Sequence, residues 1–297
     1  MTDLQLAPKM RGFFTLIATN ADTGEQRVLA EFENLLLDGG INNMGGTPML
    51  PNVYVGSGST APINTNSALE HLIAGTPLST TDHGGDPSGY GWLRVTYNFN
   101  VGVAAGNLSE VGVGASATNL LSRSLIKDGT GSPTSITVLS NEYFTVVYEL
   151  RLYPPTADSS FHATIDGVDT TCTLRAAEAG TTQWSPWGAL NGCSGGSSTN
   201  NGSTVYDGDI GAVTGTPSGS SYQAGNSVYG VYVNNALNID MQTALIPVNQ
   251  ANFSGGIKSM LFRTSMGSYQ VSFNPTINKT SSKTMQLTMR FSWTRNS

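Results

Sequence analysis

The stretch NLSEVGVGASATNLLSRSLIKDGTGSPTSITVLSNEYFTVVYELRLYPP, from Asn107 to Pro155, carries the clearest strand signals in the chain. From Tyr143 to Tyr153 the residues alternate with period two, which is typical of a strand with one buried face. The predicted buried face consists of five apolar side chains, Phe144, Val146, Tyr148, Leu150 and Leu152. The strand must end at Pro154 and Pro155, because proline has no backbone N–H to donate to a neighbouring strand.

Similar patterns occur within this stretch and before it. Residues 92–101 alternate between an apolar and a polar face, and residues 111–114 and 120–127 predict further short strands. Upstream, residues 12–19 and 25–32 are apolar runs separated by NADTG, where Gly24 can supply a positive φ angle. This pattern predicts a β-hairpin with a five-residue loop.

Helical signals are short. The segment NLLLDGGINNMGG, residues 34–46, predicts one or two helical turns, with Gly39 and Gly40 ending the first. Residues 66–74 have Leu69, Leu72 and Ile73 at helical spacing and predict a short helix. Because strands and Gly turns dominate, we predict an all-β fold of antiparallel β-sandwich domains, with short helical turns and long Gly/Ser/Asn-rich loops. A closed barrel is the alternative.

The proline pair predicts a domain boundary, giving a first domain at residues 1–155 and a second β-rich, loop-rich domain at residues 156–297. In the second half, residues 161–175 predict a hairpin that turns at Asp166 and Gly167. Residues 180–225 are rich in Gly, Ser, Thr and Asn and predict long loops with a few strand fragments. Strand signals resume at residues 227–233, 257–264, 269–274 and 285–294.

Charged residues make up only 11% of the chain, against roughly 25% in ordinary soluble domains. The formal net charge is −6, and no basic stripe is present, so we expect no nucleic-acid partner. We find neither an apolar run long enough for membrane insertion nor a signal peptide, and therefore expect synthesis in a cytosol. There, Cys172 and Cys193 are expected to stay reduced, although the sequence leaves a bridge between them open.

A series of short motifs resembles a family of structural proteins from the tails and tail fibres of tailed bacteriophages. The motifs occur in the family's order: NLLLDGGINNMG, VGSGSTAP, TNSALEHLIAG, LSEVGVG, LLSRSLIKD and YELRLYPP. The resemblance covers residues 10 to 155 and implies a virion-assembly role for the first domain. It also implies location in the virion tail, with partners that include copies of this chain, other tail proteins and a host surface receptor.

Two groups of acidic residues and a histidine are candidates for metal binding or acid–base catalysis. Asp82, His83 and Asp86 superficially resemble a metal or acid–base cluster, but their Gly- and Pro-rich setting favours a turn. A second acidic group resembles a calcium loop but lacks further oxygen ligands and a distal Glu, so turns are favoured again. It comprises Asp166, Asp169, Asp207 and Asp209.

Catalysis by a glycosidase would need two carboxylates, for which the sequence offers Glu110, Glu142, Glu149 and Glu178. Sequence places no two of these at a fixed separation, and Glu149 fits better in an exposed salt bridge with a neighbouring arginine. The histidines, His71, His83 and His162, have no nucleophile-elbow context. We therefore predict a non-enzymatic protein with no catalytic residue, no cofactor and no metal.

Aromatic residues after the boundary form the predicted contact site for another subunit or a receptor: Trp184, Trp187, Tyr206, Tyr222 and Tyr229. They could also hold the Gly-rich region onto its own domain. The favoured function is a homo-oligomeric tail fibre, baseplate or tail-tip component. The alternatives are a receptor-binding tip that recognises a surface glycan or pilus and, third, a capsule or lipopolysaccharide depolymerase.

Overall fold

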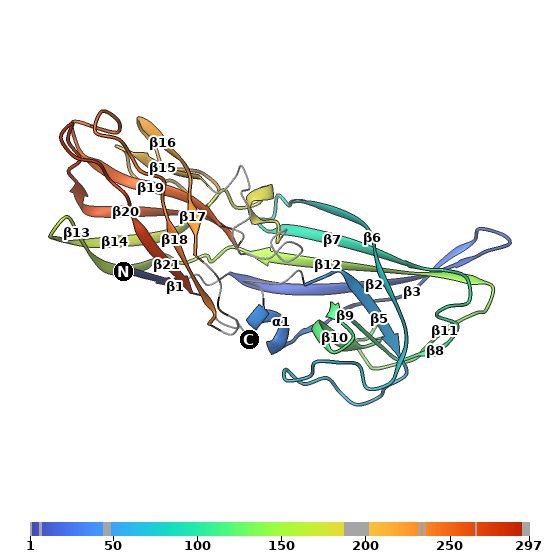
Figure 1. The fold of residues 1–297 in the computed structure, drawn as a ribbon. Helices are drawn as coiled ribbons and strands as arrows, with labels where there is room; N and C mark the ends of the chain where they lie inside the picture. Colours follow the sequence, from blue (N-terminus) through green and yellow to red (C-terminus); the bar gives the residue numbers. More distant parts are fainter. Residues whose placement is uncertain are drawn as a thin grey trace.

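A computed structural model describes residues 2–5, 8–43, 49–186, 202–230, 233, 236–264 and 266–292. The molecule is elongated (Figure 1). The strands within residues 9–153, here called the first half, lie at one end. The strands within residues 159–292 lie at the other end together with residues 2–5, and they are called the second half. The described residues are nearly all in strands and loops, and almost every strand pair is antiparallel. The predicted all-β antiparallel sandwich class is therefore confirmed.

The first half contains a nine-stranded sheet in the order β3-β2-β12-β7-β6-β5-β9-β10-β4 and a two-stranded sheet of β8 and β11. Their bounds, with those of the one α-helix of the described residues, are β2 Lys9–Asn20, β3 Gln26–Glu33, β4 Leu35–Leu36, α1 Asp38–Asn43, β5 Asn52–Gly56, β6 Leu72–Gly85, β7 Gly91–Phe99, β8 Gly106–Leu108, β9 Glu110–Ser116, β10 Asn119–Leu125, β11 Ile136–Val138 and β12 Glu142–Tyr153. Strand β6 forms the corner of this sheet. It pairs with β5 over Leu72–Pro77 and with β7 over Leu78–Gly85, so it links two layers of a sandwich.

The core of the first half lies between these layers. The predicted alternation is confirmed, because Phe144, Val146, Tyr148, Leu150 and Leu152 of β12 are all fully buried. On the neighbouring strand β7, Leu93, Val95, Tyr97 and Phe99 are buried in the same way. Each such side chain contributes about 1.5–3 kcal/mol through removal from water. The layers are also joined by the Tyr97 hydroxyl, which donates to the Leu50 carbonyl at 2.8 Å.

The second half contains a six-stranded sheet in the order β13-β14-β20-β19-β15-β16 and a four-stranded sheet in the order β1-β21-β18-β17. The bounds of their elements are β1 Thr2–Gln5, β13 Ser159–Ile165, β14 Val168–Ala177, the 3-10 helix η1 Thr182–Trp184, β15 Gly202–Tyr206, β16 Ser221–Asn226, β17 Val228–Tyr229, β18 Asn238–Gln242, β19 Ile257–Thr264, β20 Gly267–Ile277 and β21 Thr288–Ser292. Phe262 of β19 stacks on Phe291 of β21, with ring centroids 5.1 Å apart, so one core joins both sheets.

Both predicted hairpins are confirmed. Strands β2 and β3 pair antiparallel around a turn in which Gly24 has φ +73°. Strands β13 and β14 turn at Asp166 and Gly167, whose φ angles of 52° and 79° suit a two-residue hairpin loop.

The two helical predictions meet different outcomes. Helix α1 forms, but it contains Gly39 and Gly40, so the prediction that they end a helix was wrong. A Cβ atom on Gly40 would lie 2.5 Å from the Leu121 Cα, so glycine allows α1 to approach β10 closely. The helix predicted at residues 66–74 is absent. That segment is a loop up to His71 and continues into β6 with Leu72 and Ile73 exposed.

The predicted domain boundary stays a prediction. The buried core residues of the first half end at Leu150, and those of the second begin at Leu152. One strand departs from the predicted ranges, because β1 at residues 2–5 pairs with β21 in the second half.

Candidate functional site

The predicted aromatic contact site is only partly a surface feature. Trp184 is fully buried, its indole N–H donates to the Ala177 carbonyl at 2.7 Å, and its ring centroid lies 5.3 Å from that of Tyr269. The prediction that Trp184 contacts a partner or receptor was therefore wrong, because the side chain fills the core of its own fold. It matches the alternative that it holds the Gly-rich region in place.

The remaining aromatic predictions are untested. Trp187 lies outside the described residues. Tyr206, Tyr222 and Tyr229 are each partly exposed on β15, β16 and β17. The Tyr229 hydroxyl donates to the Arg263 carbonyl at 3.0 Å, so this side chain is anchored within the chain.

Trp184 also fixes the contact between the two halves. The Ser185 hydroxyl donates to the Trp92 carbonyl at 3.1 Å. A Cβ atom on Gly91 would lie 2.1 Å from the Trp184 carbonyl carbon, so only glycine fits there without movement of the backbone. The start of β7 and the end of η1 therefore pack backbone against backbone.

The most organised polar cluster of the described residues is a buried ion pair between β9 and β10. Glu110 is 0% exposed and Arg123 is 3% exposed, and the guanidinium Nη2 lies 2.9 Å from a carboxylate oxygen. These strands are antiparallel neighbours, with Leu125 opposite Glu110 and Arg123 opposite Gly112. An ion pair removed from water needs further hydrogen bonds to offset the cost of desolvation.

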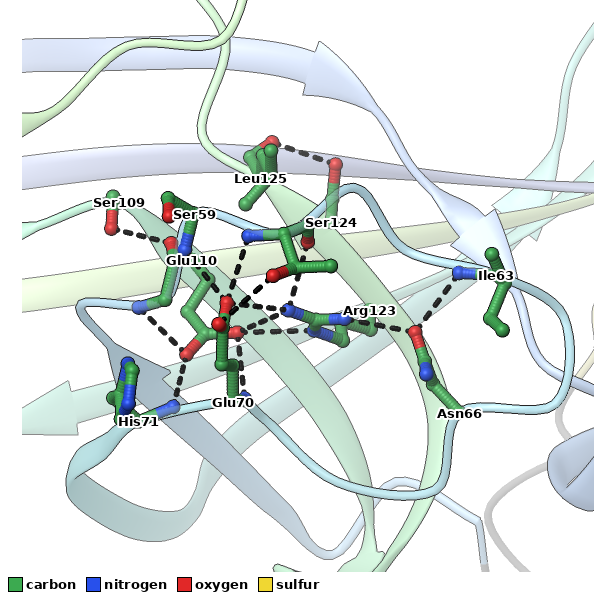
Figure 2. Close-up of polar contacts among 12 residues, drawn as sticks. Ser59, Ile63, Asn66, Glu70, His71, Ser109, Glu110, Arg123, Ser124 and Leu125 are labelled. Atoms are coloured by element: carbon green, nitrogen blue, oxygen red, sulfur yellow. Dashed lines mark hydrogen bonds and ion pairs between the residues drawn. The ribbon is translucent and has the colours of Figure 1, made fainter.

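Those hydrogen bonds come from the loop at residues 57–71, which runs around the pair (Figure 2). The Glu110 carboxylate accepts the backbone N–H groups of Gly58 at 2.9 Å, Glu70 at 3.1 Å and His71 at 2.8 Å. A side chain on Gly58 would collide with this carboxylate, since its Cβ would lie 2.4 Å from Oε1. These bonds explain why residues 66–74 do not form the predicted helix.

Arg123 binds other points of the same loop. Its guanidinium donates to the Asn66 side-chain oxygen at 2.8 Å and to the Thr60 carbonyl at 3.1 Å. Asn66 in turn accepts the Ile63 backbone N–H at 2.9 Å. One buried ion pair therefore holds both ends and the middle of the loop.

Glu70 forms a second layer of the cluster. Its carboxylate accepts the backbone N–H groups of Ser59 and Thr60, each at 2.8 Å, and the Thr60 hydroxyl at 2.9 Å. The hydrogen bonds from the Thr60 backbone and side chain hold the pKa of Glu70 below its ordinary value. The carboxylate is thus kept ionised and acts as a further tie within the loop.

The chemistry of this cluster is structural. A general acid or base must be able to reach a substrate proton, whereas the Glu110 oxygens are buried and already accept four donor groups. The ion pair instead gives a long surface loop one defined conformation. That loop presents Ile63 to solvent with 59% of its surface exposed.

The other glutamates considered for glycosidase chemistry are also paired with arginine. Glu142 binds Arg27 at 2.9 Å, Glu149 binds Arg94 and Arg151 at 2.6 Å each, and Glu178 binds Arg263 at 2.5 Å. The predicted salt bridge between Glu149 and a neighbouring arginine is confirmed, since Arg94 lies opposite it on β7 and Arg151 lies two residues along β12. The expectation that this salt bridge is exposed was wrong for the Glu149 side chain, which is only 13% exposed, whereas Arg94 is 45% exposed.

The acidic clusters behave largely as the turn interpretation predicts. Asp86 accepts the Ser88 backbone N–H at 2.9 Å in a turn, and Asp207 accepts the Ser220 N–H at 2.7 Å. Asp82 and His83 differ, because they lie in β6 and not in a turn, and Asp169 likewise lies in β14. Within the described ranges, no group of three or more His, Cys, Asp or Glu residues could hold a metal ion.

Comparison with family models, curated proteins and solved structures found no match to this chain. Across the described ranges, no helix has the length and apolar character needed to cross a membrane.

Proposed function

We propose that this chain is a structural protein of a bacteriophage tail that acts through interfaces between subunits. The proposal rests on the order of the motifs between residues 10 and 155. Two of those motifs, residues 55–62 and 65–75, supply most of the loop above the ion pair, and two others contain Glu110 and Arg123. A loop that is held in one conformation before binding loses little entropy when a neighbouring subunit packs on it.

The observation that best supports an assembly role is the exposure of β6. Residues 77–83 are seven consecutive exposed positions within a hydrogen-bonded strand. Along Leu78–Gly85 the strand pairs with β7 on one side, and no strand of the described residues pairs with its other side. An open strand edge of this length can add a strand from another chain.

Two other edges are less suited to pairing. On β3, Leu29 falls at an irregularity in the pairing with β2, and the strand carries Arg27, Glu31 and Glu33. Bulges and charges of this kind block edge-to-edge association. At the opposite edge of the sheet, β4 contains two residues. The open part of β6 also has an irregularity, at Ser79, and carries Asp82. It nevertheless has one carboxylate where β3 has three charged residues, and it is longer than β4. We therefore infer that β6 is the principal assembly edge of the first half.

Immunogold electron microscopy of virions purified from the strain that carries the gene tests the tail location. Labelling along the tail or baseplate supports the proposal. Absence of the protein from purified virions, checked by mass spectrometry of the same particles, would refute it.

Light scattering tests the role of β6 on the purified protein. We expect a mass that is a multiple of the 31.2 kDa chain, reduced by Thr81→Lys, which places a charge in the middle of the open edge. Thr156→Lys adds the same charge at an exposed site outside β6 and should leave the mass unchanged. Equal effects of the two substitutions would exclude β6 as the interface.

A further inference from the structure

A cavity of about 780 Å³ opens at the side of the second-half sandwich. It lies between the face of the six-stranded sheet and the segment at residues 277–289 that leads from β20 to β21. Its apolar lining includes Phe161, Cys172, Met260, Phe273, Met285 and Met289. The volume falls within the roughly 300–1,000 Å³ that is common for small-molecule sites.

The cavity is open because the sandwich closes incompletely on this side. Strand β13 is the edge of its sheet, and its alternating residues Phe161, Ala163 and Ile165 are only partly covered. Between β20 and β21, the described chain makes a single bridge, from Met285 to Ile246, and no continuous ladder. Apolar side chains on both walls therefore face a space that the protein does not fill.

Lys279 lines this cavity and is 4% exposed. Its Nζ donates to the Asn252 side-chain oxygen at 2.9 Å, and no carboxylate of the described residues lies within ion-pair distance. Burial lowers the pKa of Lys279, because loss of water disfavours the ammonium form. A buried ammonium with only an amide partner can still accept a counter-charge.

The other charged residues around the cavity do not supply a counter-charge for Lys279. Lys283 and Asp166 line the rim and form an ion pair with each other. The lining therefore holds two lysines and one aspartate, a local charge of +1 in a chain whose net charge is −6. This local excess favours an anionic group over a neutral one.

We propose that the cavity binds an anionic amphiphile, a molecule with an alkyl chain and a carboxylate head. The alkyl chain packs between β13 and the segment at residues 277–289. The carboxylate accepts a hydrogen bond from Lys279 Nζ and completes an ion pair for which the described residues supply no carboxylate. This proposal is independent of the tail-assembly function, and either can fail alone.

Isothermal titration of the full-length protein with octanoate and with 1-octanol tests the proposal. We expect saturable octanoate binding that strengthens about threefold to fourfold for each added methylene in a series from hexanoate to decanoate. Lys279→Met should weaken octanoate binding at least tenfold and leave 1-octanol binding unchanged. Lys9→Met, at an exposed position of β2, is the control and should bind like the wild type.

Ala163→Trp gives an independent test, since it fills the cavity from a partly exposed edge strand and does not depend on Lys279 being replaceable. It should weaken the binding of both ligands. The proposal is overturned if the wild-type protein shows no saturable octanoate binding. It is also overturned if Lys279→Met, when folded, binds octanoate as tightly as the wild type, or if Ala163→Trp binds it unchanged.

Discussion

Replacing Arg123 by methionine removes the cation from the buried ion pair and leaves the Glu110 carboxylate in place. Breaking a buried pair from one side costs about 3–5 kcal/mol of unfolding free energy, because an uncompensated charge stays buried. Three backbone N–H groups continue to bind this carboxylate. We therefore expect a loss of about 3 kcal/mol, at the low end of that range.

Glu110→Leu should cost more than Arg123→Met. It leaves the guanidinium buried and also removes the acceptor of the N–H groups of Gly58, Glu70 and His71. Since each unsatisfied buried donor costs about 1–3 kcal/mol, we expect a total loss of about 5 kcal/mol or more. Glu110→Leu is thus expected to lower the unfolding free energy more than Arg123→Met, because Glu110 is the partner that binds the backbone of the loop.

Urea unfolding followed by circular dichroism measures both losses. Hydrogen exchange by mass spectrometry should show that residues 57–71 lose protection in Glu110→Leu and keep part of it in Arg123→Met. Arg11→Met is the matched control, because its pair with Glu33 at 3.6 Å is exposed and should contribute at most about 1 kcal/mol. The reasoning is refuted if Arg123→Met costs no more than this control, or if Glu110→Leu is the milder of the two variants.

Three further outcomes follow from buried groups of the second half. Trp184→Ala should lower the unfolding free energy by about 3–5 kcal/mol in urea titrations, and an effect below about 1 kcal/mol would contradict its place in the core. Although burial raises the pKa of Glu178, hydrogen bonds from Arg263 and Ser268 outweigh it and lower that pKa. The ionised Glu178 therefore stabilises the fold above pH 4.5, its ordinary pKa, and this contribution is lost as the pH falls through the lowered pKa. The urea concentration at the unfolding midpoint should fall with decreasing pH in this range, and it should fall less steeply in Arg263→Met. Burial raises the pKa of Cys172 to about 11, so in a Cys193→Ser background this thiol should react with a disulfide reagent at pH 8 only after unfolding, and rapid reaction of the native protein would contradict its burial.

Local patterns were enough to predict much of the fold. The period-two alternation of β7 and β12, the hairpin loop at Gly24 and the turn at Asp166 all depend on neighbouring residues, and all are confirmed. The same reasoning gave a wrong prediction for residues 66–74. Leu69, Leu72 and Ile73 have helical spacing, but the backbone N–H groups of Glu70 and His71 donate to the carboxylate of Glu110, about 40 residues away. These hydrogen bonds hold the segment in a loop.

The site was harder to predict because it depends on strand register. The sequence identifies Glu110 as one of four candidate carboxylates, but our interpretation of the sequence gave Arg123 no role, although it stands in the apolar run LLSRSL. A charged residue within such a run signals a buried partner, yet only the pairing of β9 with β10 identifies that partner as Glu110. Trp184 shows the opposite error, since its Gly-rich neighbourhood suggested a surface loop while its side chain is in the core.

The parallel pairing of β1 with β21 has a consequence for synthesis on the ribosome. Residues 2–5 leave the exit tunnel before their partner strand at residues 288–292, which emerges nearly three hundred residues later. The four-stranded sheet therefore cannot be completed co-translationally before residue 292 has emerged, whereas every strand of the nine-stranded sheet is available by residue 153. Vectorial folding would thus begin with the first half, and synthesis of residues 288–292 would be the step that permits closure of the four-stranded sheet in the second half.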